Sequence, residues 1–504
     1  MNQPDLRPSK RFYLTSLVSI TALTGLSVVL AGFSLQGARF AGFAADDAIY
    51  LLMAEYFSQP GTYDAVLIYT QAYSHLPPLY PLLIASLTDA ADLVPQAFIV
   101  QTGCLILAAS VWSIIIGRET GQRYAVVPLL FALVLLPGTL LLTTAIWSEF
   151  LYVLLVGMAM LSLQLTAQRR IYIYAAGMLI GFSAVTRGFG LVAIIALALH
   201  FALRRQRGGF IVVCIAIAPY AASQLVGLGG GSYWEFFRER IFDMNTLAQT
   251  IEANVASLAN GWIASFSPFH LAPGLLLNTL ILPLSIIGFY ERLRRFEFDA
   301  IYTVGYFSLL LIWPFPDVTW RLVYPAIPIA IFHAFVGVTV IRRHLRGNLM
   351  RYAPAAVLGA LIATNVVGLI GLSVRYTDQA LPAALDNWRA SRSWLTASSV
   401  EKGIDDLAVR QATLELLTMA ESTLPPKACI YANYPQPVML YGRRASWPAP
   451  TGADRPTRPA CEFHLVVSDK RAPGDIGSLW SDYDIVLQSK AGDGIGAVLV
   501  RYRQ

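Results

Sequence analysis

The chain has 504 residues, of which 56% are hydrophobic and only 13% are charged, and its formal net charge is +6. Because a soluble domain carries roughly a quarter of charged residues, this composition excludes a water-soluble globular protein. It predicts an integral membrane protein.

Apolar runs along the chain predict a polytopic α-helical protein with about 11 transmembrane helices, since a helix needs about 20 residues to cross the hydrocarbon core. The runs lie at 13–34, 96–116, 125–143, 149–167, 171–186, 189–203, 210–228, 272–290, 299–314, 321–341 and 353–373. The first run is too long for a cleaved signal region, so we expect it to remain as the first helix. Residues 1–373 are therefore predicted to form one membrane domain.

The basic residues between these runs predict the orientation. They cluster in alternate loops, for example at 204–207, 292–295 and 342–346. Because cationic side chains cross a membrane poorly, these loops and the N-terminus are predicted to be cytoplasmic. The segment 374–504 is then periplasmic or extracellular. No stripe of basic residues with interleaved aromatics occurs, so no nucleic-acid partner is expected.

The first outer loop, 35–95, is predicted to hold two helices that lie in the membrane interface. Ile49, Leu52, Met53 and Tyr56 have the spacing of one apolar helix face, and Asp46 stands at the cap position. The prolines at 77–78 fit the start of a second helix over 78–88. The fourth outer loop, 229–271, is long and aromatic and is predicted to be irregular.

The composition changes after about residue 374, where long apolar runs end. An amphipathic helix is predicted at 399–422, and short strands are predicted at 429–432, 438–441, 463–467, 484–488 and 497–502. This segment is therefore predicted to be a small exported α/β domain. An oxidising compartment would permit a Cys429–Cys461 disulfide, but the sequence does not decide whether the bond forms.

Asp46 and Asp47 are the first candidate site residues, because two adjacent acids at a membrane boundary need water, a metal, a cation or chemistry nearby. One carboxylate could deprotonate an acceptor hydroxyl or amine while the other orients it or binds a metal. Alternatively, both acids cap the interfacial helix and complement its dipole. The same dipole interpretation is open for Glu149, which begins the 149–167 run.

Arg187 and Arg321 lie on the predicted outer side, against the general distribution of basic residues. An arginine at such a place is costly unless it is paired, and guanidinium groups bind phosphate bidentately. Snorkelling to the interface is the alternative for Arg321. His75 could bind phosphate or carboxylate, or simply be solvated. All these residues share one predicted side of the membrane, as an enzyme acting on a lipid phosphate requires.

The region 12–373 resembles the GT-C superfamily of polyprenyl-phosphate-dependent glycosyltransferases, especially its protein O-mannosyltransferase and lipid A aminoarabinose transferase branch. Asp46-Asp47 stands where that family has Asp-Glu, and Glu149 where it has a second acid. Arg187-Gly188 matches its basic-Gly pair, and Arg321-Leu322-Val323-Tyr324-Pro325 matches its Arg-x-x-Tyr-Pro motif. His75-Leu76-Pro77-Pro78 replaces a Lys-x-Pro-Pro turn, so the lysine contact to phosphate is replaced or lost.

The resemblance implies an inverting hexosyl- or pentosyltransferase in the inner (plasma) membrane. It would move a sugar from a polyprenyl-phosphate carrier to a glycan, lipid or protein acceptor on the outer face. Asp46 would be the catalytic carboxylate, with Asp47 and Glu149 as further acids. His75, Arg187, Arg321 and Tyr324 would bind the donor phosphate. The resemblance makes no cofactor certain and leaves open a divalent metal ion, which Asp46 and Asp47 would hold.

Two other functions remain as alternatives. An O-antigen ligase or polymerase-like enzyme also uses lipid carriers and outer-face arginines, but its key residues lie mainly in a large late loop. A lipid or sugar transporter or flippase would place ionisable groups near mid-membrane and show paired repeats. The sequence names neither the sugar nor the acceptor.

Overall fold

The computed structural model describes residues 46–59, 76–87, 93–121, 126–143, 145–206, 208–226, 243–266, 272–344, 352–376, 400–432, 435–448, 461–467, 483–491 and 494–502. The predicted span 13–34 and His75 lie outside these ranges. The predicted domain boundary at 373/374 stays a prediction, since the last helix of the bundle ends at Tyr376 and the next described helix begins at Val400.

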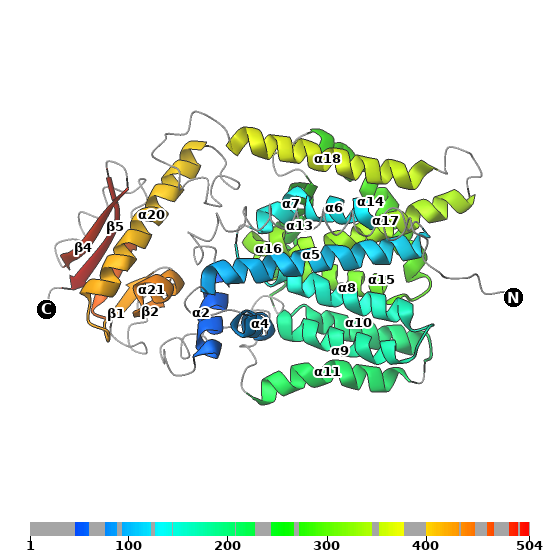
Figure 1. Ribbon diagram of the computed structural model, residues 1–504, viewed down its shortest axis with the longest axis horizontal. Coiled ribbons are helices and arrows are strands. Elements are labelled where there is room, and N and C mark those ends of the chain that lie inside the picture. Colours follow the sequence, from blue (N-terminus) through cyan, green and yellow to red (C-terminus); the bar gives the residue numbers. More distant parts are fainter. Residues whose placement is uncertain are drawn as a thin grey trace, which may run out of the picture.

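Long helices packed side by side form most of the molecule (Figure 1). Two helices from the first predicted loop, α2 (Asp46–Ser58) and α4 (Leu79–Leu87), lie at one end of this bundle. The bundle contains α5 (Leu93–Glu119), α6 (Val126–Val134), α7 (Pro137–Leu142), α8 (Glu149–Leu165), α9 (Ile171–Thr186), α10 (Gly190–Leu203), α11 (Gly209–Leu225), α13 (Met244–Phe266), α14 (Ala272–Leu293), α15 (Phe298–Leu311), α16 (Pro316–Leu322), the 3-10 turn η4 (Tyr324–Ala326), α17 (Ile327–His344) and α18 (Ala353–Tyr376).

Most predicted apolar runs coincide with one helix, but two are interrupted. The run 125–143 divides into α6 and α7 at Pro137, which lacks an N–H and disfavours a helical residue before it. The run 321–341 begins with α16 and η4 before α17. Among the described residues, two helices, Leu93–Glu119 and Tyr324–His344, are long and apolar enough to cross a membrane. The number of spans therefore stays a prediction.

The prediction of an irregular loop over 229–271 is wrong for its described part, because Met244–Phe266 forms the 23-residue helix α13. Its buried face includes Thr250, Asn254 and Ser265. These polar residues stand at positions where a buried helix face usually has apolar residues. The sequence therefore lacks the helical spacing of apolar residues that would have predicted α13.

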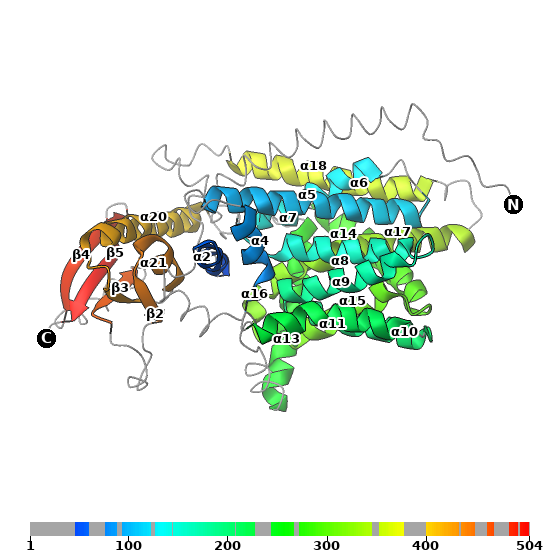
Figure 2. The ribbon, with the colours of Figure 1, turned by 60° about the horizontal axis from the view of Figure 1, so that its bottom comes forward.

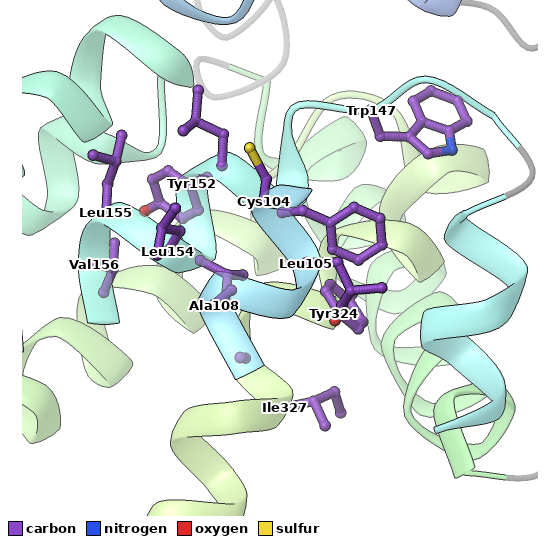
Figure 3. Packing of buried hydrophobic residues seen from close by; sticks show 14 of the residues in the cluster. Cys104, Leu105, Ala108, Trp147, Tyr152, Leu154, Leu155, Val156, Tyr324 and Ile327 are labelled. Atoms are coloured by element: carbon purple, nitrogen blue, oxygen red, sulfur yellow. The ribbon is translucent and has the colours of Figure 1, made fainter. Parts of the chain in front are cut away.

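One continuous apolar core joins the helices of the bundle. Figure 3 shows part of it, where side chains of α5, α8 and η4 meet. Helices α14 and α17 approach closest at Gly288, where an added Cβ would lie 1.9 Å from the carbonyl oxygen of His333. Glycine is thus required for this backbone-to-backbone contact.

The C-terminal domain contains a five-stranded mixed sheet covered by α20 (Val400–Thr423) (Figure 2). The strand order is β2-β1-β3-β5-β4. Strand β1 (Cys429–Ala432) is parallel to β2 (Ala445–Pro448) and β3 (Phe463–Val467), whereas β5 (Gly494–Tyr502) is antiparallel to β3 and to β4 (Tyr483–Ala491). The predicted helix and four of the five predicted strands are therefore present.

The predicted strand 438–441 is wrong, because these residues belong to the helix α21 (Pro435–Gly442). Its first residue is a proline, which fits a helix start, and Val438 and Met439 are consecutive residues that are both buried. The helix packs on α20 and α2 at once, so both of its sides are covered. Strand β2, which follows it, was not predicted.

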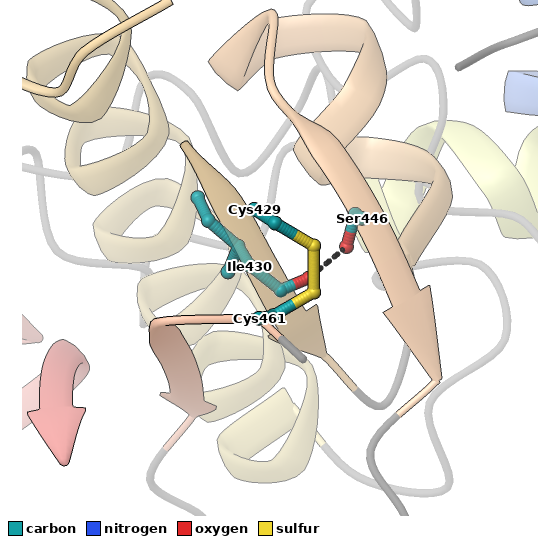
Figure 4. Close-up of a disulfide and its surroundings, with 4 residues drawn as sticks. All are labelled: Cys429, Ile430, Ser446 and Cys461. Atoms are coloured by element: carbon teal, nitrogen blue, oxygen red, sulfur yellow. Dashed lines mark hydrogen bonds between the residues drawn. A yellow bond between two sulfur atoms is a disulfide. The ribbon is translucent and has the colours of Figure 1, made fainter. Parts of the chain in front are cut away.

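Cys429 and Cys461 form a disulfide (Figure 4). The bond joins the start of β1 to the segment just before β3. Beside it, the Ser446 hydroxyl donates a 2.8 Å hydrogen bond to the carbonyl oxygen of Ile430, which links β2 to β1. The disulfide left open by the sequence is thus part of the sheet that carries α21.

Helix α2 lies between the bundle and the C-terminal domain (Figures 1 and 2). Met439 and Leu440 of α21 belong to the same apolar core as the bundle. Arg443, one residue beyond α21, contacts both carboxylate oxygens of Glu55 at 2.5 and 2.6 Å. The helix that begins with Asp46 is therefore held from both sides.

Candidate active site

Two carboxylates and two guanidinium groups meet where α2, α8, α9 and α16 come together. Arg321 forms a hydrogen-bonded ion pair with Asp46. Arg187 Nη1 lies 2.7 Å from Glu149 Oε2, and Arg321 Nε lies 4.0 Å from Glu149 Oε1. Glu149 thus stands between the two arginines, and the formal charges of the four residues cancel. We call these four residues the carboxylate–arginine cluster.

Each member of the cluster comes from the end of a helix. Asp46 begins α2, Glu149 begins α8, and Arg321 is in the last turn of α16. Arg187 caps the C-terminus of α9 in an extended conformation. The tight turn that follows needs Gly190, because an added Cβ there would lie 2.2 Å from the backbone nitrogen of Ala184.

The two carboxylates differ in their access to solvent. The Glu149 side chain is completely buried, whereas 27% of the Asp46 side chain is exposed. Among the described residues, neither oxygen of Glu149 makes a hydrogen bond, so its charge is balanced only by the two arginines. A substrate could reach Asp46, but Glu149 is suited to hold the guanidinium groups in place.

The segment before α8 is held by Gln101 of α5, which sequence analysis did not identify. Gln101 is buried, donates a 2.7 Å hydrogen bond to the Ala145 carbonyl and accepts one of 2.6 Å from the Trp147 N–H. Next in the chain, the Ser148 hydroxyl lies 2.8 Å from the Tyr50 hydroxyl and accepts a 3.1 Å bond from Arg187. These contacts connect α2, α5 and α9 around Glu149.

Arg321 also stacks on an aromatic ring. Its guanidinium carbon lies 4.2 Å from the centre of the Trp147 ring, which is cation–π geometry. The charged planar group is thus fixed in one orientation.

Helix α13 positions the α16 segment that carries Arg321. Asn254 is fully buried and donates to the carbonyl oxygens of Leu311 and Trp313 at 3.0 and 2.8 Å. Its own oxygen accepts a 2.9 Å bond from Thr319, two residues before Arg321. An isolated asparagine in the sequence gives no signal for this role, because its partners lie 57 to 65 residues away.

Asp47 differs from Asp46 in its surroundings. It is buried, and its Oδ1 accepts a 2.8 Å bond from the Ala48 N–H. It lies near Tyr441 of the C-terminal domain, where burial and, to a smaller extent, the Asp47 carboxylate raise the pKa of the Tyr441 phenol far above its usual value. The adjacent acids therefore face different parts of the molecule.

The remaining predicted site residues are Tyr324 and His75. Tyr324 is buried three residues after Arg321, and its hydroxyl accepts a 3.2 Å bond from Thr139 of α7. Its ring packs edge-on against Phe150, with 5.3 Å between the ring centres. Figure 3 shows it among the apolar side chains of the core. His75 lies outside the described residues, so its place in the site stays a prediction.

Asp46 and Asp47 do not fit a shared metal site, because one contacts Arg321 and the other faces α21. Within the described ranges, no group of three or more histidine, cysteine, aspartate or glutamate residues could hold a metal ion. We therefore derive no chemical step through a metal.

Solved structures with a similar fold include ArnT from Cupriavidus metallidurans. Its apo structure matches 96% of this chain and 98% of its own, with a TM-score of 0.54 and 14% identity. Its complex with undecaprenyl phosphate gives the same TM-score and identity over 95% and 97% of the two chains. An Archaeoglobus fulgidus oligosaccharyltransferase, tethered with an acceptor peptide containing the NVT sequon, matches 84% of this chain at a TM-score of 0.45 and 15% identity.

No model of a sequence family and no curated protein sequence matches the chain. The likeness to ArnT supports the predicted resemblance to the GT-C superfamily at the level of the fold alone.

Proposed function

We propose that this chain, which has the GT-C fold, is an inverting membrane glycosyltransferase. It moves a sugar from a polyprenyl-phosphate carrier to a glycan, lipid or protein acceptor on the outer face of the plasma membrane. The carboxylate–arginine cluster is the observation that carries the proposal. A solvent-accessible carboxylate lies beside two fixed guanidinium groups, which are the groups that such a reaction needs.

The arginines are suited to bind the donor phosphate. A phosphodiester oxygen that binds the Arg321 guanidinium would compete with Asp46, because the phosphate oxygen and the Asp46 carboxylate oxygen would accept hydrogen bonds from the same N–H donors. Asp46 would then be released beside the acceptor. Arg187 and Arg321 would both stabilise the charge that develops on the phosphate as it leaves.

Asp46 is the general base in this mechanism. It accepts the proton of the acceptor hydroxyl or amine while that atom forms a bond to the anomeric carbon of the sugar. The bond from the anomeric carbon to the phosphate oxygen breaks, and its electron pair stays on the phosphate. The phosphate gains one negative charge and Asp46 loses one, so the total charge beside the arginines does not change.

The test is transfer of a radiolabelled sugar from polyprenyl-phosphate donors by the full-length protein in reconstituted membranes. We expect Asp46→Asn to lower kcat by about 100-fold or more, the usual contribution of a general base. The matched control is Asp243→Asn, which removes an exposed acid before α13. Full activity in Asp46→Asn would remove Asp46 as the base. Absence of transfer with every donor, together with ligand flux, would favour a transporter.

A further inference from the structure

A second polar site lies at the other end of the bundle. The cluster involves the N-terminus of α8, the C-terminus of α9 and the end of α16, whereas a cavity of about 410 Å³ is lined by the opposite ends of α8 and α9. Since α8 has 17 residues, the two sites are about 25 Å apart along this helix. The cavity takes no part in the proposed transfer.

The polar wall of the cavity has more cations than anions. It carries four arginines, Arg118, Arg204, Arg292 and Arg295, and three carboxylates, Glu119, Glu297 and Asp299. Three of the arginines form ion pairs, including Arg292 with Asp299 and Arg204 with Glu297. Arg118 is exposed and forms no ion pair with any residue that the structure describes. One cation is therefore available to an anionic ligand.

An unpartnered amide lies in the same wall. Gln164 lines the cavity, and both polar atoms of its side chain are shielded from water without a hydrogen bond to the described part of the chain. A buried amide without partners costs free energy, so buried polar groups are normally satisfied. Gln164 could donate to one ligand oxygen and accept from a ligand hydroxyl.

The remaining lining combines the polar residues Thr166, His200 and Gln206 with an apolar part. The apolar part consists of Met160, Leu163, Ile173, Phe201 and Phe298. A ligand that covers both kinds of surface must have an anionic head and a hydrocarbon part. Basic pockets between membrane helices bind phosphate head groups in this way, because arginine pairs bidentately with phosphate oxygens.

We propose that this cavity binds the phosphate head group of an anionic phospholipid, through Arg118 and the Gln164 amide. The bilayer that surrounds these helices supplies such a lipid, and the apolar lining would contact its glycerol and first acyl carbons. The same chemistry would also recognise free inorganic phosphate, and the experiment must separate these two sources.

The test measures ligand binding to delipidated full-length protein in detergent, by native mass spectrometry and by the shift in Tm. The probes are phosphatidylglycerol, diacylglycerol and inorganic phosphate. We expect phosphatidylglycerol to bind and to raise Tm, and diacylglycerol to do neither. Arg118→Gln and Gln164→Leu should each weaken phosphatidylglycerol binding about tenfold, as loss of one charge-assisted or buried hydrogen bond does.

Arg170→Gln is the matched control, because Arg170 is exposed at the same end of the bundle and does not line the cavity. It should bind phosphatidylglycerol like the wild type. A Tm shift with inorganic phosphate alone that depends on Arg118 would keep the phosphate site but exclude the lipid as its source. Equal phosphatidylglycerol binding by all three variants would overturn the proposal. So would a Gln164→Leu variant that only raises Tm without changing binding.

Discussion

The adjacent carboxylates of α2 have different surroundings although they are neighbours in the chain. Asp46 is partly exposed and pairs with Arg321, while Asp47 is buried and faces Tyr441. Successive residues on a helix point about 100° apart, so one can face the bundle while the next faces another domain. This difference in direction separates a candidate base from a residue at a domain contact.

Asp47→Asn tests this division of roles. The asparagine can still accept the hydrogen bond from the Ala48 N–H. We therefore expect kcat to fall by less than about tenfold, far less than the loss of about 100-fold or more expected for Asp46→Asn. The measurement is sugar transfer at saturating donor. Equal losses in the two variants would show that both acids act at the reacting atoms.

Chelation tests the metal-free mechanism. Because Asp46 already has a guanidinium partner, we expect EDTA to leave transfer within about twofold of its untreated rate. The rate should be measured after dialysis against EDTA and again after Mg²⁺ or Mn²⁺ is added. Lost activity that either ion restores would contradict the mechanism.

At the scale of elements, the site depends on helices that carry no candidate catalytic residue. Helix α5 holds the segment before Glu149 through Gln101, and α13 holds the segment before Arg321 through Asn254. Ser257 adds a 2.7 Å bond from its hydroxyl to the carbonyl oxygen of Pro316. These buried side-chain amides and the hydroxyl thus bond backbone carbonyls at or between helix ends and hold the connecting segments in place.

Asn254→Leu removes the three bonds that Asn254 makes to the α16 region and leaves the Ser257–Pro316 bond in place. We expect the free energy of unfolding to fall by about 2–4 kcal/mol, because two buried carbonyls lose the Asn254 donor and the Thr319 hydroxyl keeps only its bond to the Phe315 carbonyl. We also expect the donor KM, measured per folded molecule, to rise as Arg321 loses its fixed position. Asn260→Leu makes the same change at an exposed position of α13 and should alter neither value much. A lower Tm with normal KM and kcat would limit Asn254 to a structural role.

At the scale of the whole molecule, the C-terminal domain and the bundle share α2. The domain contributes Met439 and Leu440 to the bundle core and pairs Arg443 with Glu55. Arg443 has a positive φ of 47°, a conformation that is costly for a residue with a side chain and that aims it at α2. The position of Asp46 thus depends on both parts of the chain.

A charge reversal tests this dependence. Glu55→Arg or Arg443→Glu alone should lower kcat/KM about two- to fivefold, because a partly exposed ion pair contributes up to about 1 kcal/mol. The double variant should recover most of the activity. Glu462→Arg, which breaks the exposed Glu462–Arg501 pair within the C-terminal domain, should leave transfer unchanged. Failure of the double variant to recover, with both domains folded, would contradict the coupling.

The sequence by itself determined the features that depend on local pattern. Apolar runs predicted most bundle helices, and the acids and arginines that break the pattern at helix ends predicted four residues that the structure brings together. The family motifs around them also predicted the GT-C fold. Charges at membrane boundaries are costly, so they are visible against an apolar background.

Tertiary structure alone decided what depends on distant partners. The helix α13, the helix α21 and the roles of Gln101 and Asn254 had no sequence signal, because their polar or mixed faces are explained only by contacts across the chain. The pairing of Asp46 with Arg321, 275 residues later, likewise follows from packing. Local composition limits which groups can lie at a helix end, but only the packing of helices selects which of them meet.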